Sequence, residues 1–543
     1  MSDTVPRPPQ EATVPEDSPR TETVDVVVMG GRIGGSATAI TLARAGHRVV
    51  VLDSATFPSD TVSTHVMFPG GIAELQRLGA LDRVLEAEAP KCRDVALIGE
   101  GVEVKGTYTP VDGIDYGLNT RRPELDMALV TTARAAGAEV RERCRVTGVV
   151  WRGNRVCGLN YTDPEGTPCT ILAKLVVGAD GRDSLFAEWV GSSRYKALPN
   201  GRGLAFHYMT DSPEGSAHYP RRDAICQWRN GEINSFVFPV NNNAITALLM
   251  PSVEIVDRCR QDPEEWDRVV AAQPEMAARL SGTVKEIKMR GATDTEGFFR
   301  TSSGPGWALV GDAGSFKDPV IAQGIRDGLW SGRTLGETVA GHLDDQKSLD
   351  AATRRYELKR DKEVIGTYYW GHKHSRVSSV SAVEMEFYRQ GQEDPQIGRD
   401  VADTFSRQIS PYKLVSVRRE VVWTLRALRR PGADRKEIAE FVVGELKLDL
   451  AYVVDRLKIK AGRRPKATVK KSWLRDGWTE HMALGNHRPS SKPYLPEEER
   501  AAAAAAAEAK KAARSTRTRR PPATTEGAAE TADAAPTQTA VSA

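Results

Sequence analysis

Apolar runs and helical patterns alternate along the first part of the chain. Residues 24–29 form a β-branched run, glycines follow, and an Ala- and Leu-rich helical pattern continues to Ala45. After a stop at Gly46, a second apolar run covers residues 48–52. This order predicts a β-α-β unit, because β-branched apolar runs favour strands and apolar residues at a period of 3.6 favour helices.

The pattern changes twice further along the chain. From about Tyr195 to Met250, short alternating apolar runs separated by Gly, Asn and Pro predict a second, antiparallel β-rich unit. From about Leu349 to Lys460, long charge-laced amphipathic stretches predict a helical C-terminal region. The other predicted elements are helices at 71–88 and 123–136, strands at 146–151, 175–177 and 307–310, and a helix from Ile325.

Composition and charge exclude several classes of protein. The 543 residues contain 75 Lys and Arg against 72 Asp and Glu, so the net charge of +3 gives no general reason to expect a nucleic acid partner. The mean hydropathy is −0.41, and no apolar run approaches the roughly 18 residues that a spanning helix needs. We therefore expect a soluble protein without a transmembrane segment.

Other features of the composition bear on location and on metals. The N-terminus lacks the apolar core of a secretory signal, so a cytoplasmic location is expected. Six cysteines without a C-x-x-C spacing indicate neither a disulfide framework nor a thiolate metal site, and no metal is expected. His372 and His374 are interpreted as surface residues of a charged helix. Residues 1–22 and 495–543 are rich in Pro, Ala, Thr and charge, and we expect both to be disordered tails.

The strongest local motif follows the first predicted strand. Its residues, Gly30-Gly31-Arg32-Ile33-Gly34-Gly35, precede the helix, and Asp53 ends the second strand. In a dinucleotide-binding unit such glycines let the backbone approach a diphosphate at the helix N-terminus, and the acidic residue accepts a hydrogen bond from a ribose hydroxyl. The motif departs from G-x-G-x-x-G, because Arg32 stands in place of the middle glycine. Arg32 either points outward or adds its charge to the phosphate contact.

Two later segments indicate which cofactor is bound. Residues 176–184 contain Gly178-Ala179-Asp180-Gly181, and residues 308–313 contain Gly311-Asp312 and precede Asp318-Pro319 and Gln323-Gly324. They resemble the second and third signatures of the aromatic-hydroxylase type (group A) FAD-dependent monooxygenases, a family related to geranylgeranyl reductase-like flavoproteins. Arg122 resembles the family's arginine at the start of the helix beside FAD. The resemblance spans roughly residues 24–345.

The resemblance implies FAD as the bound cofactor and NADPH or NADH as a transient reductant. It implies that the glycine motif holds the FAD diphosphate and that Asp53 holds the adenosine ribose. Backbone groups near Gln323, Gly324 and Ile325 would stabilise the reduced flavin at a helix start. The remaining implied contacts are Arg122 with the diphosphate or ribityl chain, the backbone near Val146 with the adenine, Asp180 in the second signature, and Asp312 with a ribityl hydroxyl.

The implied fold class is α/β, with a Rossmann-type FAD-binding domain, an inserted antiparallel β-sheet substrate domain and a helical C-terminal region. The FAD-binding domain would comprise residues 23–190 and 291–345. The substrate domain would comprise residues 191–290, and the helical region residues 346–494. The sequence shows no second G-x-G-x-x-G unit and no C-x-x-C, which argues against the disulfide reductases with two dinucleotide domains.

The polar segment 60–65 ends at His65, in the part of the chain where members of the family run a loop beside the isoalloxazine ring. A catalytic His65 would donate a hydrogen bond to flavin or substrate, move a proton or carry a covalent flavin link. A structural His65 would instead satisfy backbone carbonyls in a turn with Ser63 and Thr64. The sequence leaves both interpretations open.

Two further groups of side chains have alternative interpretations. The aromatic and histidine side chains of the antiparallel unit would suit a pocket for a planar apolar substrate. Such side chains also commonly fill the buried face of a sheet. These residues are Phe206, His207, Tyr208, Tyr219, Trp228, Phe236 and Phe238. The basic residues from Arg456 to Arg475 have no carboxylate between them, and we interpret them as a solvated surface rather than a contact to nucleic acid or a membrane.

The main functional expectation is an FAD-dependent monooxygenase that hydroxylates or epoxidises a small apolar or aromatic substrate with dioxygen, through a flavin hydroperoxide. The first alternative is an FAD-dependent reductase of isoprenoid double bonds. The second is a non-catalytic, flavin-bearing interaction protein. A halogenase is disfavoured, because the tryptophans of its W-x-W-x-I-P segment are absent at residues 234–239. The oligomeric state is left open.

Overall fold

The computed structural model describes residues 21–198, 201–218 and 222–463. The chain divides into two units, Met1–Arg488 and Pro489–Ala543, and all described residues belong to the first. Most of the N-terminal tail and all of the C-terminal tail proposed from the sequence lie outside the described residues. The boundary at residue 22 is corrected, because Thr21 and Glu22 already pair with Thr170 and Ile171 in a sheet.

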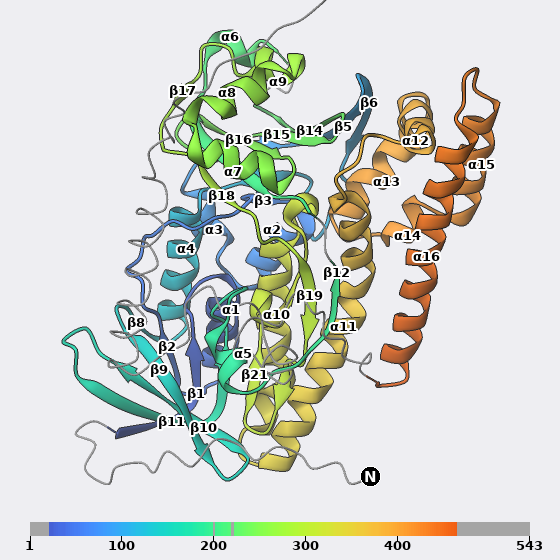
Figure 1. The fold of residues 1–543 in the computed structure, drawn as a ribbon. Helices are drawn as coiled ribbons and strands as arrows, with labels where there is room; N and C mark the ends of the chain where they lie inside the picture. The colour runs from blue at the N-terminus through green and yellow to red at the C-terminus, as the bar shows by residue number, and fades with distance from the viewer. Residues whose placement is uncertain (1–20, 199–200, 219–221, 464–543) are drawn as a thin grey trace, which may run out of the picture. The chain divides into compact units, whose positions relative to one another are not determined.

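The first sheet is built around the predicted β-α-β unit (Figure 1). β1 (Thr21–Met29) pairs in parallel with β2 (Val49–Leu52) on one side and with β11 (Pro168–Gly178) on the other. The strand order is β20-β21-β11-β1-β2-β8, and the antiparallel strands β10 and β9 extend the sheet from β11. The other bounds are β8 Glu139–Arg141, β9 Arg145–Arg152, β10 Arg155–Thr162, β20 Ser303–Gly304 and β21 Trp307–Leu309.

Different elements cover the two faces of the parallel strands. One face packs against α1 (Ile33–Arg44), α4 (Arg122–Ala135) and α10 (Gly324–Val339) through residues such as Val26 and Val28. The other face packs against β9, β10 and α5 (Leu185–Trp189) through residues such as Val27 and Val50. Burial on both faces explains why the sequences of these strands are continuous Val-rich runs.

The helix predicted at 71–88 is two helices in the structure. α2 (Pro69–Arg77) ends before Gly79, and α3 (Leu81–Leu85) follows. Gly79 has a φ of +63°, in the left-handed region, which ends an α-helix and which glycine adopts without steric cost.

The second sheet contains the predicted antiparallel unit. Its order is β17-β13-β16-β15-β14-β5-β6, with β18 beside β13. β5 and β6 come from residues 94–107, inside the range 23–190 proposed for the FAD-binding part, and β5 pairs in parallel with β14. The bounds are β5 Asp94–Gly99, β6 Val102–Thr107, β13 Leu204–Thr210, β14 Ala224–Asn230, β15 Ile233–Val240, β16 Ala244–Met250, β17 Val284–Lys285 and β18 Arg290–Ala292.

Helices also pack against this second sheet. One face carries Trp228 and packs against Trp266 and Met276, which belong to α8 and α9. The helices on this part of the chain are α6 Pro213–Ser216, α7 Val253–Gln261, α8 Pro263–Ala271 and α9 Pro274–Arg279. Two small sheets complete the strands: β3 (Val66–Met67) with β7 (Gly117–Asn119) and β4 (Lys91–Cys92), and β12 (Arg194–Leu198) with β19 (Gly297–Arg300) and β22 (Ser315–Phe316).

The C-terminal region is helical, as predicted. Its helices are α11 Gln346–Ser375, α12 Ala382–Glu393, α13 Pro395–Phe405, α14 Pro411–Leu414, α15 Val417–Arg429 and α16 Arg435–Lys460. Three short 3-10 helices precede this region: η1 Gly311–Ala313, η2 Pro319–Ile321 and η3 Ala340–His342. Figure 1 shows α16 running beside α11 and α15 beside α12. The α/β class with an antiparallel sheet and a helical C-terminal region is confirmed. Within the described ranges, every helix is too short or too polar to cross a bilayer.

Candidate functional site

The glycine motif forms a tight turn between β1 and α1. Gly30 has a φ of +100°, and a Cβ atom there would lie 2.5 Å from the carbonyl oxygen of Ala179. A Cβ atom on Gly35 would lie 1.8 Å from the carbonyl oxygen of Gly30. No side chain caps the first turn of α1. The turn therefore requires glycine, and the backbone N–H groups in the first turn of α1 are available to an anion.

The three signature segments converge on this turn. Gly30 contacts the second signature at Ala179, and a Cβ atom on Gly34 would lie 3.3 Å from Val310 of the third. The close approach continues between α1 and α10, where a Cβ atom on Gly332 would lie 2.4 Å from the carbonyl oxygen of Gly34. Segments that are more than 100 residues apart thus form one site.

Asp53 holds the turn from the end of β2. Its Oδ2 accepts a hydrogen bond from the backbone N–H of Gly31 at 2.7 Å, and its Oδ1 accepts one from Ala55 at 2.8 Å. Each carboxylate oxygen keeps a further lone pair, which can accept from a ribose hydroxyl. The position agrees with the ribose contact that the resemblance implies.

Arg32 takes part in a buried ion-pair network. Its guanidinium pairs with Asp126, which is fully buried, and donates to the backbone oxygen of Ser59 at 3.0 Å. Arg122 pairs with the same Asp126, with an Nη2–Oδ1 distance of 2.9 Å. Two arginines therefore share one carboxylate, which leaves a net positive charge for a diphosphate. Ile33 beside them is buried in the core.

Asp126 is a residue that the sequence analysis missed. It lies one helical turn after Arg122 on α4, a spacing that favours an ion pair. That spacing was visible in the sequence. The second partner was not, because Arg32 is 94 residues away along the chain.

The third signature places Asp312 in η1, just before α10. Burial raises the pKa of Asp312 to about 6, against the lowering effect of Lys317, Arg182 and Arg122. Within the part of the chain that the structure describes, no hydrogen bond to its carboxyl group is found. A half-buried acceptor without a partner among the described residues fits a ribityl hydroxyl.

The start of α10 offers backbone N–H groups. Gln323 precedes the helix and Gly324 and Ile325 begin it, and no side chain caps its first turn. The side chain of Gln323 is already used, because its Nε2 donates to Phe405 at 3.0 Å and its Oε1 accepts from Arg407 at 2.7 Å. The role implied for these three residues thus falls on their backbone, which can stabilise negative charge at the helix N-terminus.

Val146 and Asp180 have mainly structural surroundings. Val146 pairs with Tyr161 in the sheet and its side chain is buried in the core, so only its backbone can face an adenine. Asp180 Oδ2 accepts a hydrogen bond from the N–H of Phe186 at 3.0 Å, in the first turn of α5, whose N-cap is Ser184. Burial raises the pKa of Asp180, and its Oδ1 is buried without a partner among the described residues.

His65 is fully buried at the end of the polar segment 60–65. Its Nε2 lies 2.5 Å from the hydroxyl group of Tyr208, and its ring packs edge-on against Phe206 at 5.5 Å. Its Nδ1 is buried and has no hydrogen-bond partner within the described residues. His65 has a φ of 65°, in the left-handed region, which is uncommon for a residue with a side chain. The ring therefore contacts side chains of the second sheet, and one nitrogen stays available to a ligand.

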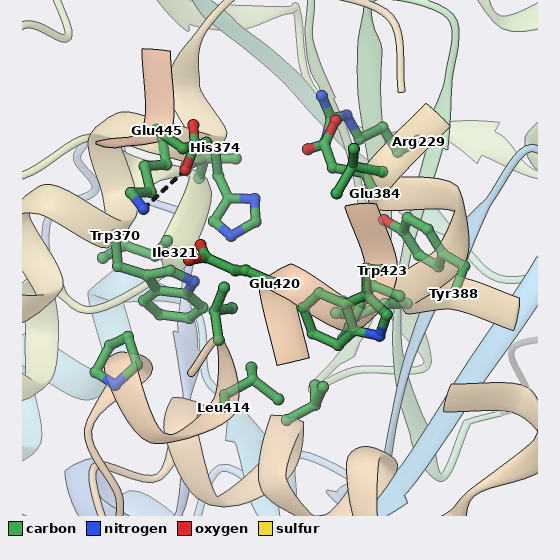
Figure 2. Close-up of a pocket in the computed structure, with 18 of the residues that line it drawn as sticks. Arg229, Ile321, Trp370, His374, Glu384, Tyr388, Leu414, Glu420, Trp423 and Glu445 are labelled. Atoms are coloured by element: carbon green, nitrogen blue, oxygen red, sulfur yellow. Dashed lines mark hydrogen bonds and ion pairs between the residues drawn. The ribbon is translucent and has the colours of Figure 1, made fainter. Parts of the chain in front are cut away.

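A separate cavity of about 120 Å³ lies between the second sheet, η2 and the C-terminal helices. Figure 2 shows His374, Trp370 and Glu420 on one side of it and Tyr388 and Trp423 on the other. The second sheet contributes Leu97, Gln227 and Arg229. The aromatic residues proposed from the sequence do not line this cavity. Phe206, Tyr208, Phe236 and Phe238 are in one buried cluster, Trp228 is in another, and His207 bonds to a backbone oxygen, while Tyr219 lies outside the described residues.

Glu420 and His374, which both line the cavity, have strongly altered pKa values. Burial raises the pKa of Glu420 to about 7, while Lys373 lowers it and Asp449 and Glu445 raise it. Burial, with the charge of Arg229, lowers the pKa of His374 to about 4. The interpretation of His374 as a surface residue is thus wrong, because its ring lines the cavity and is desolvated there.

Glu420 and Trp370 belong to the cavity only through the tertiary structure. Trp370 packs edge-on against His374 at 5.5 Å, and its indole Nε1 is buried without a partner among the described residues. Trp370 lies on α11 and Glu420 on α15, and no sequence motif surrounds either residue. A tryptophan on a helix usually packs in a core and a glutamate usually faces solvent, so neither residue type predicts a cavity.

The comparisons with known proteins agree with this geometry. The menaquinone reductase of Mycobacterium tuberculosis is 29% identical over 333 residues, which are 58% of this chain and 76% of that protein. The digeranylgeranylglycerophospholipid reductase of Methanocella arvoryzae is 28% identical over 353 residues, 63% of this chain and 83% of that protein. A solved flavoprotein/dehydrogenase from Cytophaga hutchinsonii has a similar fold, with a TM-score of 0.63 and 17% identity over 78% of this chain and 100% of that chain.

The residues around the glycine turn fit FAD. They provide a turn that only glycine can form, an acidic residue at the end of β2, two arginines, and at Asp312 a half-buried acceptor with no hydrogen bond among the described residues. Residues 23–365 match the family described as FAD binding domain. The chain therefore belongs to this FAD-binding family and is an FAD-dependent oxidoreductase.

Proposed function

We propose that this protein is an FAD-dependent reductase that saturates a carbon–carbon double bond in an apolar, isoprenoid-type substrate. The observation that carries the proposal is the carboxyl group of Glu420, which has a pKa of about 7 inside a cavity lined by aromatic side chains. The names of the two relatives, a menaquinone reductase and a digeranylgeranylglycerophospholipid reductase, support a reductase that acts on an isoprenoid compound.

The cavity and the flavin site share one segment. Val320 and Ile321 of η2 line the cavity, and α10 begins three residues later at Gly324. The backbone groups proposed to face the flavin therefore directly follow a wall of the cavity. A substrate in the cavity would lie on the flavin side of the second sheet.

Saturation of a double bond requires a hydride and a proton. Bound FAD, once reduced by NADPH or NADH, supplies the hydride. Protonated Glu420 donates its proton to one carbon of the double bond while the other carbon accepts the hydride, and the Glu420 carboxylate then regains a proton from solvent. A pKa near 7 suits this role, because about half of the carboxyl groups are protonated at neutral pH.

The apolar and aromatic residues that form most of the cavity wall fit an apolar substrate, and charged residues such as Arg229 and Lys373 line the rest. Trp370, Tyr388 and Trp423 present rings that exclude water from the reacting carbons. His374 is neutral at physiological pH because its pKa is about 4, so it adds no charge beside the substrate. The carboxyl group of Glu420 thus faces the substrate without a competing cation on His374.

The test is product analysis with the purified holoprotein, NADPH or NADH, and two probes, menaquinone and a geranylgeranyl lipid. We expect a product that has gained two hydrogen atoms. Glu420→Gln should lower this rate by about 10²–10⁴-fold and leave flavin reduction by the nicotinamide unchanged. Glu440→Gln, the same change on the exposed side of α16, is the control and should react like the parent protein. A full rate in Glu420→Gln would disprove the role of Glu420.

Monooxygenation is the second candidate, because the aromatic walls at Trp370, Tyr388 and Trp423 also suit a planar ring. The same experiment separates the two reactions. A product that has gained one oxygen atom, with consumption of dioxygen, would favour the monooxygenase. In that case Glu420→Gln is expected to retain more of its rate, because transfer of an electrophilic oxygen does not require a proton donor at the carbon.

A further inference from the structure

We infer that the outer face of α15 and α16 docks on a membrane surface that contains anionic lipid. Large apolar side chains are exposed on both helices, including Val417 at 77% and Leu450 at 67%. The set consists of Val417, Val421, Leu425 and Leu428 on α15 and of Val443, Leu446, Leu450, Val453, Val454 and Leu457 on α16. Elsewhere in the described ranges, only Val62, Leu185 and Val284 are comparably exposed.

The spacing of these residues places them on one side of each helix. On α16 the exposed residues Val443, Leu446, Leu450, Val453 and Leu457 follow steps of three and four, which is the spacing of one helix face. The buried residues Ile438, Glu445 and Ile459 lie on another face and pack inward. α16 is therefore apolar on its outer side as well as on its inner side. Exposed apolar patches of this kind mark interaction surfaces.

Positive charge accompanies the apolar face. Residues 417–463 contain 12 Lys and Arg and 7 Asp and Glu, and two of these acids, Glu445 and Asp455, are buried. Arg418, Arg426, Arg429, Lys447, Arg456 and Lys460 are exposed, and no ion pair is found for them among the described residues. Long basic side chains beside an apolar helix face reach the phosphate level of a bilayer while the apolar side chains enter it.

The charge favours lipid over a second copy of the chain. A symmetric contact between two such faces would bring basic side chains toward each other, which is unfavourable. An anionic lipid surface is complementary to the same charges. The spacing on α16 would also suit a helix of a second copy, so the experiment distinguishes the two occupants.

The inner sides of the same helices line the cavity. Glu420 and Trp423 come from α15, and Phe441 and Glu445 come from α16. Docking would therefore hold the cavity close to a bilayer, which is the source of long apolar substrates. This point alone rests on the proposed function. The exposed residues and their charges are independent of it.

The test is sedimentation of the full-length holoprotein with vesicles of phosphatidylcholine, with and without phosphatidylglycerol. We expect binding that requires phosphatidylglycerol and weakens with added salt. The variant L446Q/L450Q/L457Q should lower the partition coefficient by about tenfold or more. Val284→Gln, at a residue 65% exposed on β17, is the matched control and should bind like the parent protein. Flavin absorbance and melting temperature show that each variant is folded.

A second variant tests the charges without touching the apolar residues. R418Q/R429Q should weaken binding to the vesicles with phosphatidylglycerol, with little change in melting temperature, because both side chains are exposed. Three results would overturn the inference. The first is that the parent protein sediments with neither kind of vesicle. The second is that L446Q/L450Q/L457Q binds the vesicles as well as the parent protein does. The third is that the parent protein is a dimer in light scattering and that this variant is a monomer with unchanged vesicle binding. Vesicle binding needs no turnover, so it can fail or succeed independently of the proposed reaction.

Discussion

The hydroxyl group of Tyr208 and the Nε2 atom of His65 lie 2.5 Å apart, in a hydrogen bond that joins β13 to the segment before β3. Burial, with the charges of Arg122 and Arg121, lowers the pKa of His65 to about 3. Burial also raises the pKa of Tyr208, so both groups are neutral at physiological pH. His65 is thus suited to hydrogen bonding through its free Nδ1 rather than to proton transfer near neutrality.

We expect His65→Asn to lower the affinity for FAD by about tenfold, because we propose that Nδ1 of His65 forms a hydrogen bond with the cofactor. Asparagine tolerates the left-handed backbone at this position, so the change does not add strain. Flavin reduction by the parent protein should show no step near pH 6.5, since a pKa of about 3 keeps His65 neutral above about pH 4. Fluorescence titration with FAD and the pH profile of flavin reduction provide the measurements. An unchanged FAD affinity with a lower melting temperature would identify His65 as a structural turn residue.

A second prediction concerns Asp126, the shared partner of Arg32 and Arg122. Asp126→Asn leaves two arginines without their buried counterion, and breaking a buried pair in this way costs about 3–5 kcal/mol. The melting temperature of the FAD-free protein should fall accordingly. Added FAD should restore part of the loss, because its diphosphate supplies negative charge beside the same arginines. If FAD raises the melting temperature of the variant no more than that of the parent protein, the two arginines do not face the diphosphate.

Asp312→Asn tests the ribityl contact. Replacement of the charged acceptor should weaken FAD binding by roughly tenfold or more, which corresponds to about 1.5–3 kcal/mol. In the parent protein, FAD affinity should decrease as the pH falls below about 6, because the carboxylate becomes protonated there. The variant should lack this pH dependence. Asp344→Asn, at a side chain that is 93% exposed, is the control. Equal FAD affinity in the parent protein and in Asp312→Asn would remove Asp312 from the site.

Glu420 also predicts how stability depends on pH. The pKa of Glu420 is about 7 in the folded protein and 4.5 in the unfolded chain. Between pH 4.5 and about pH 7 the folded protein therefore binds more protons than the unfolded chain. Its stabilising contribution is complete below about pH 4.5 and is lost as the pH rises through about 7. From about pH 5 to about pH 8 the parent protein should therefore lose about 1 kcal/mol more stability than Glu420→Gln, a value reduced for the partial exposure of the side chain. Melting curves of both proteins at pH 5 and pH 8 measure this difference in stability. An equal loss of stability in the parent protein and in Glu420→Gln would contradict the raised pKa of Glu420.

The sequence by itself determined the elements whose contacts are local. One stretch of 24 residues contains the turn from Gly30 to Gly35, the helix after it and Asp53. The β-α-β unit brings these parts together by local folding alone. The α/β class and the helical C-terminal region also followed from the sequence, because periodicity reflects which faces are buried.

Only the tertiary structure decided which polar groups are buried together. Asp126 meets Arg32 across 94 residues, and Glu420 enters a cavity whose walls come from the second sheet, η2 and α11 to α16. A pKa depends on desolvation and on nearby charges, and both come from segments that are distant in the sequence. The same reason explains His374, which a charged helix pattern placed at the surface, whereas the second sheet and the other C-terminal helices enclose the cavity that it lines. The pattern of one helix defines its faces, but the neighbouring elements determine what covers each face.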